Sequence, residues 1–69
     1  MKPNNLKFYR QQADGLSQAK LSETVGVTER CYQNYEYGKH LPDVETAQRL
    51  AKALGVTVPD LFPLPRESN

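Results

Sequence analysis

The sequence predicts an all-α fold, a compact domain of five short helices. Apolar and polar residues alternate over no more than a few positions, so strand signals are absent. Apolar residues recur instead at the spacings that place side chains on one face of a helix. Side chains that cap helix N-termini precede these segments, and a glycine follows most of them. These observations place five helical segments along the chain.

The first helix is expected over about residues 5–13. Leu6, Tyr9 and Ala13 recur at positions i, i+3 and i+7, which puts them on one helical face. An asparagine supplies the N-terminal cap. The Asp14-Gly15 pair ends the helix, because glycine readily adopts the left-handed conformation of a C-terminal cap.

The second helix begins after the cap Ser17 and ends near Val25. Leu21 and Val25 form its inner stripe, and Ser22 is small where a neighbouring helix would approach most closely. Gly26 can take the left-handed conformation that a tight turn requires. The pattern therefore predicts a sharp turn between two helices that pack at a steep angle.

The third helix is expected over residues 28–37, with Thr28 as its cap and Gly38 at its end. Tyr32 and Tyr35 fall on the side that faces the second helix. Cys31 falls on the same side, as a small core residue.

The fourth helix begins after Pro42, with Asp43 as its cap, and stops at Gly55. Its expected buried face follows the spacing i, i+3, i+7 and i+10. The residues on that face are Val44, Ala47, Ala51 and Leu54.

A last short helix has Thr57 and Asp60 in the capping-box relation. It delivers Leu61 and Phe62 to the core. The chain is therefore expected to form one domain over residues 1–62, followed by a proline-containing tail over residues 63–69 that does not continue the helix.

Composition predicts a small cytoplasmic protein without a metal or cofactor. A single cysteine excludes an internal disulfide, and the single histidine, His40, has no metal-binding partners. No apolar run approaches the roughly 20 residues of a membrane span, and residues 1–5 do not resemble a signal peptide. No nucleophile–base pair, paired catalytic carboxylates or phosphate-cradling loop is present, so no enzymatic activity is expected.

The outer side of the third helix carries the chemistry. Arg30 suits a bidentate pair with guanine, Gln33 or Asn34 a pair with adenine, and Glu29 accepts from the cytosine amino group. An ordinary solvated face is the alternative for any one polar helix side. The capped helices on both sides of Gly26 favour DNA recognition instead.

These features resemble the lambda-repressor-like (Xre/Cro) helix-turn-helix family, over about residues 6 to 62. The resemblance implies a five-helix fold, sequence-specific DNA binding and a dimer on a palindromic operator. The segments that carry it are Gly15-Leu16-Ser17-Gln18 through Gly38-Lys39, Leu41-Pro42, Leu50-Ala51-Lys52-Ala53-Leu54-Gly55-Val56 and Asp60-Leu61-Phe62.

The resemblance also implies residue roles. Base contacts fall to Glu29, Arg30, Gln33 and Asn34, and phosphate contacts to Gln18, Lys39 and His40. Arg10 and Glu36 resemble the family's structural ion pair between the first and third helices. Tyr32 departs from the family, which mostly has isoleucine or valine there, so its hydroxyl needs a partner or the helix tilts.

Two functions are expected from different classes. The first is a transcriptional regulator, a repressor, that binds a palindromic operator as a homodimer through residues 28–37. Leu61, Phe62 and Leu64 offer apolar surface for the dimer, although Leu61 and Phe62 equally suit the core of one chain. The second is a protein-interaction module, such as the antitoxin of a toxin–antitoxin pair with a toxin as partner, which the low net charge of +1 favours.

Overall fold

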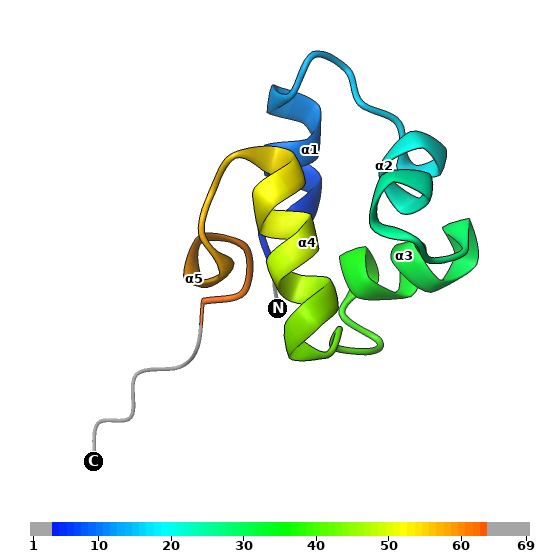
Figure 1. Cartoon of the computed structure of the whole chain (residues 1–69), viewed down its shortest axis with the longest axis vertical. Helices are drawn as coiled ribbons and strands as arrows, with labels where there is room; N and C mark the ends of the chain where they lie inside the picture. The colour runs from blue at the N-terminus through cyan, green and yellow to red at the C-terminus, as the bar shows by residue number, and fades with distance from the viewer. Residues whose placement is uncertain (1–3, 64–69) are drawn as a thin grey trace.

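The computed structural model describes residues 4–63. Five helices and no strand occur in this range, as expected for an all-α fold (Figure 1). None of these helices is long and apolar enough to cross a membrane. Their bounds are α1 (Leu6–Gln12), α2 (Gln18–Val25), α3 (Glu29–Tyr37), α4 (Val44–Leu54) and α5 (Val58–Leu61).

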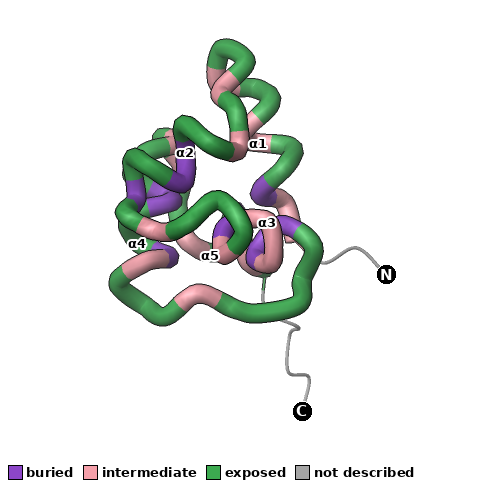
Figure 2. The backbone as a smooth tube through the Cα atoms, turned by 90° about the vertical axis from the view of Figure 1, so that its right-hand side faces the viewer, coloured by how far each residue is buried: buried purple, intermediate pink, exposed green. Residues whose placement is uncertain are grey.

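Helix α4 lies at the centre of the arrangement. It packs against α2 on one side and against α5 on the other, while α3 packs against both α2 and α1 (Figure 1). Buried positions occur on the inner sides of the helices, whereas the loop between α3 and α4 is largely exposed (Figure 2). The α2–α3 pair is therefore held by two further helices, because α4 packs against α2 and α1 packs against α3.

The predicted N-terminal caps are confirmed for α2 to α5. In each case the cap side chain accepts a hydrogen bond from the backbone N–H three residues later, which satisfies one of the free donors of the first turn. The second capping-box bond, between Thr57 N–H and Asp60, is also present. The cap residues are Ser17, Thr28, Asp43 and Thr57.

The start of α1 is tied to the other end of the domain. Asn5 is the N-cap without a side-chain capping bond, and the Asn4 carboxamide oxygen instead accepts from the Leu6 N–H at 2.9 Å. Asn5 donates through its backbone to the Leu61 carbonyl at 3.0 Å and through its side chain to the Asp60 carbonyl at 2.9 Å. These bonds hold the first helix against α5.

The buried face of α4 differs from the expectation at Val44 and Leu50, and Leu54 is half-buried against the core. Ala47 and Ala51 are buried as expected, but Val44 is 74% exposed. Leu50 is fully buried, although the spacing did not predict it. Val44 is the first residue of α4 and follows an exposed loop, so no element covers it. Leu50 continues the three-residue spacing from Ala47 and lies near the middle of the helix, which packs against α2 and α5.

The C-terminal end of the domain completes the core of a single chain. Leu61 is fully buried and Phe62 packs against the core from a half-buried position. Leu61 therefore has no surface left for a dimer contact, which corrects one of the two expectations for it. Leu64 and the rest of the expected tail after Pro63 lie outside the described residues.

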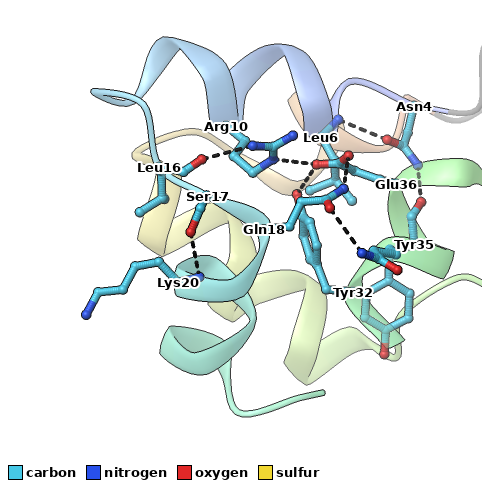
Figure 3. A network of polar contacts seen from close by, with 11 residues as sticks. Asn4, Leu6, Arg10, Leu16, Ser17, Gln18, Lys20, Tyr32, Tyr35 and Glu36 are labelled. Carbon is cyan, nitrogen blue, oxygen red and sulfur yellow. Dashed lines mark hydrogen bonds and ion pairs between the residues drawn. The ribbon is translucent and has the colours of Figure 1, made fainter. Parts of the chain in front are cut away.

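A buried carboxylate joins three helices at the back of α3. Arg10 of α1 donates through Nε to Glu36 Oε2 at 2.6 Å, and the Tyr32 hydroxyl donates to the same oxygen at 2.6 Å. Gln18 of α2 donates to the other oxygen, Oε1, at 2.9 Å. These side chains converge on Glu36 from three directions (Figure 3). The carboxylate is 2% exposed and has a donor on each oxygen.

The surroundings of Glu36 act on its pKa in opposite directions. Burial would raise the pKa, because it disfavours the charged form. The hydrogen bonds from Arg10, Tyr32 and Gln18, together with the positive charge of Arg10, outweigh burial and leave the pKa below its ordinary value. Glu36 is therefore a charged group at neutral pH inside the domain.

The corrected core leads to a prediction for α4. Leu50→Ala removes a fully buried side chain and should lower the free energy of unfolding by about 2–5 kcal/mol. Val44→Ala, on the same helix but exposed, should change it by no more than about 0.5 kcal/mol. Urea unfolding followed by circular dichroism measures both changes. A larger loss of stability for Val44→Ala than for Leu50→Ala would contradict the observed orientation of α4, in which Leu50 is buried and Val44 is exposed.

The ionised state of Glu36 leads to a second prediction. Its folded-state pKa should lie below the value of about 4.3 for an unfolded glutamate. Between these two values the unfolded chain binds more protons than the folded one, so the free energy of unfolding should fall as the pH falls. Titration of the Glu36 side-chain carbon by NMR gives the pKa directly. A midpoint above the unfolded value would mean that burial outweighs the hydrogen bonds.

Candidate nucleic-acid interface

The turn between α2 and α3 sets the position of the candidate interface. Gly26 has a φ of 84°, in the left-handed region, and its N–H bonds to the Ser22 carbonyl at 2.9 Å. The Val27 N–H bonds to the same carbonyl at 3.0 Å. A Cβ on Gly26 would meet only Arg49 at 3.7 Å, an ordinary contact, so the backbone conformation rather than space requires the glycine.

Helix α3 has a buried side and an outer side. Tyr32, Tyr35 and Glu36 are buried, and Cys31 is half-buried against the core. The residues predicted to contact bases lie on the outer side: Glu29 and Arg30 are exposed, and Gln33 and Asn34 are half-buried. Glu29 and Arg30 are therefore open to solvent, whereas other parts of residues 4–63 partly cover Gln33 and Asn34.

Two glutamines connect the outer side of α3 to α2. Gln33 donates from Nε2 to Gln18 Oε1 at 3.2 Å, and Gln18 donates from its own Nε2 to Glu36 at 2.9 Å. Each carboxamide nitrogen carries two hydrogens, so Gln18 and Gln33 each keep one N–H beyond these bonds. Gln33 also keeps its Oε1. This N–H and oxygen form the donor and acceptor pair that adenine N7 and N6 require.

The loop after α3 turns back toward the end of that helix. The backbone N–H groups of Lys39 and His40 bond to the Asn34 carbonyl at 2.9 Å and 3.4 Å. Gly38 permits this return because its φ is 81°. Both side chains are exposed. The Lys39 and His40 side chains therefore lie at the C-terminal end of α3, whereas Gln18 lies at the N-terminus of α2.

The reasoning from sequence missed the bonds that Gln18 makes. It assigned this residue to a surface role, but its side chain lies between Glu36 and Gln33. The partners are 18 and 15 positions away along the chain, so no local pattern indicates them. The sequence does show a glutamine at the first position of α2 and another on the outer side of α3, but it does not show that the two side chains meet.

Other candidate chemistry is limited to the residues already described. Within residues 4–63, no three His, Cys, Asp or Glu side chains lie together in a way that would hold a metal ion. Tyr37, the last residue of α3, is 59% exposed.

Comparison with known proteins places the chain in a family. A family model described as helix-turn-helix matches residues 6–61. The chain is 39% identical over 54 residues to the uncharacterized HTH-type transcriptional regulator YgzD of Bacillus subtilis (strain 168), a match that covers 78% of this chain and 82% of YgzD. It is 36% identical over 59 residues to the uncharacterized HTH-type transcriptional regulator MJ0272 of Methanocaldococcus jannaschii, covering 86% of this chain and 88% of the relative.

Solved structures have the same fold. A chain of the SinR protein/SinI protein complex superimposes with a TM-score of 0.73 at 25% identity, over 86% of this chain and 57% of that chain. A transcriptional regulator from Listeria innocua gives a TM-score of 0.73 at 23% identity, over 93% of this chain and 60% of its own length. The chain thus spans little more than half of each of these structures. Because the family model covers all of α1 to α5, the chain belongs to the lambda-repressor-like helix-turn-helix family.

Proposed function

We propose that this protein is a sequence-specific DNA-binding transcriptional regulator that acts through α3. The observation that carries the proposal is the outer side of α3, on which the exposed Glu29 and Arg30 lie together with the half-buried Gln33 and Asn34. An α-helix with its side chains is about 10–12 Å across, which matches the major groove of B-DNA, about 12 Å wide. Relatives described as transcriptional regulators support the same function.

The proposed base contacts follow from the chemistry of each side chain. Arg30 is exposed, and its guanidinium matches guanine O6 and N7. Gln33 is restrained by Gln18 and keeps the donor and acceptor that adenine needs. Asn34 offers a second carboxamide for adenine, and Glu29 accepts from the cytosine amino group. A carboxylate near the DNA also repels phosphate, so Glu29 contributes to the rejection of other sequences.

The proposed phosphate contacts flank the recognition helix. Gln18 has one free N–H at the first turn of α2, where backbone N–H groups and the helix dipole attract an anion. Lys39 and His40 are exposed at the other end, after α3. Contacts on both sides of the groove would fix the register of α3 without reading sequence.

Homodimerisation and repression are further parts of the proposal. One recognition helix contacts too few base pairs for selectivity in a genome, and two-fold pairing with half-sites about 10 base pairs apart solves this problem. Leu41 and Val44 expose 78% and 74% of their surface close to α3, an apolar surface of the kind that subunits cover. In the cytoplasm, a dimer bound to its operator DNA would block the binding of other proteins to that site, so repression is the proposed outcome.

A protein-interaction module, such as an antitoxin with its toxin, is the second candidate. The net charge of +1 is low for a nucleic-acid binder. The SinR protein/SinI protein complex shows that a protein of this fold occurs together with a second protein. Such a function is compatible with DNA binding, because partner and DNA can use different surfaces.

Selection from random duplex DNA tests the proposal. The expected result is an enriched palindrome whose half-site centres lie about 10 base pairs apart. Sedimentation of the purified protein with and without the selected DNA reports the number of subunits. If no sequence is enriched at low salt, where electrostatic binding is strongest, the DNA-binding proposal is wrong and the protein-interaction candidate is favoured.

Two substitutions should separate base reading from phosphate binding. Arg30→Ala should cost about 1–3 kcal/mol at one base pair of each half-site and relax the preference there. Lys39→Ala should weaken binding to all sequences and reduce the salt slope by about one. Titrations by fluorescence anisotropy at several salt concentrations measure both effects.

Lys52→Ala is the matched control. Lys52 lines the same surface hollow as Thr24, which is near the C-terminal end of α2, and the helical rise places Gln18 about 9 Å from Thr24 along the helix. Its removal should leave affinity and sequence preference unchanged. An unchanged base preference in Arg30→Ala would contradict the proposed orientation of α3 in the groove.

A further inference from the structure

We propose that Tyr32 is a positioning residue for base reading, which acts through Glu36 and Gln18 on the Gln33 side chain. Four hydrogen-bonded side chains link the core to the outer side of α3: Tyr32, Glu36, Gln18 and Gln33. The inference rests on the proposed function, because it concerns the residues assigned to DNA. It adds a buried residue that touches no DNA to those that determine specificity.

The first link is the orientation of the Glu36 carboxylate. Arg10 contributes a single bond from Nε to Oε2 at 2.6 Å, while its Nη1 donates to the Leu16 carbonyl at 2.9 Å. One bond leaves a carboxylate free to rotate about that contact. The Tyr32 hydroxyl supplies a second donor to Oε2 at 2.6 Å, from the same helix as Glu36. Two donors on Oε2 hold the plane of the carboxylate, and this directs Oε1 toward Gln18 (Figure 3).

The second link is the orientation of the two carboxamides. Gln18 donates to Glu36 Oε1, so its own Oε1 must point the other way, and there it accepts from Gln33 at 3.2 Å. If the Gln18 carboxamide rotated by half a turn, its oxygen would face the carboxylate and its NH₂ would face the NH₂ of Gln33. The charge of Glu36 therefore selects which face of Gln33 is presented to solvent.

Burial gives Tyr32 its fixed role as a donor. The side chain is fully buried, and a hydroxyl in this position is costly unless it has a partner. Burial, followed by the hydrogen bond to Glu36, raises the pKa of Tyr32, so the hydroxyl keeps its proton. An apolar side chain would fill the same core position but would provide no donor to Oε2. The hydroxyl therefore serves the polar network rather than the packing of the core.

NMR of the DNA-free protein tests the inference without any binding measurement. In Tyr32→Phe, the side-chain NH₂ signals of Gln18 and Gln33 should shift and show increased motion relative to the wild type. Tyr35→Phe is the matched control, because it removes a hydroxyl from another buried tyrosine of α3 that does not contact Glu36. Unchanged Gln18 and Gln33 signals in Tyr32→Phe would overturn the inference. If this variant unfolds, sucrose restores the compact state for the measurement.

DNA binding by a double-mutant cycle tests the consequence. Tyr32→Phe should reduce the discrimination at the base pair read by Gln33 by about two- to tenfold, the equivalent of one net hydrogen bond. In the Gln18→Ala background the same substitution should have no further effect on that discrimination, because the link is already broken. An equal effect in both backgrounds would show that Tyr32 does not act through Gln18.

The two proposals fail in different ways. If the wild type selects no DNA sequence while the Gln18 and Gln33 signals still respond to Tyr32→Phe, the DNA function is wrong and the positioning role stands. If DNA is selected but Tyr32→Phe lowers only the free energy of unfolding, Tyr32 is a structural residue and the inference is wrong.

Discussion

The structure depends on keeping one carboxylate charged inside a chain of only 69 residues. Removing an ion from water costs several kcal/mol, which only close partners offset. Glu36 meets this condition with donors from α1, α2 and its own helix. Because these donors must all reach the same group, they restrict how α1 and α2 sit against α3. The bonds to Glu36 therefore hold one side of α3 against these two helices.

The apolar core and the polar network contribute different things. Leu6, Leu21, Leu50 and Leu61 supply burial, which is not directional and would tolerate small rotations of the helices. Hydrogen bonds near 2.6 Å to Glu36 do not tolerate such rotations. We therefore attribute the compactness of the domain to the leucines and the orientation of α3 to Glu36. This division explains how a small core can still present a well-defined surface.

Sequence reasoning succeeded where the physics is local. Each cap and the glycine turns after α2, α3 and α4 depend on residues within a few positions, so the caps at Ser17 and Thr28 were predictable. Val44 was misplaced because periodicity defines a helix face but not how far a neighbouring helix covers it. The Gln18–Gln33 bond was missed because it depends on the angle between two helices, which no single helix pattern contains.

Low charge and restrained side chains fit together in the proposed function. Non-specific DNA affinity comes almost entirely from phosphate neutralisation, and a net charge of +1 provides little of it. Specific binding then depends on base contacts that cost little to form. A glutamine already held by Gln18 loses less conformational entropy on binding than a free one. A nearly neutral domain would thus bind non-specific sequences weakly. The buried network compensates for the low charge, because it orients Gln33 before DNA binds.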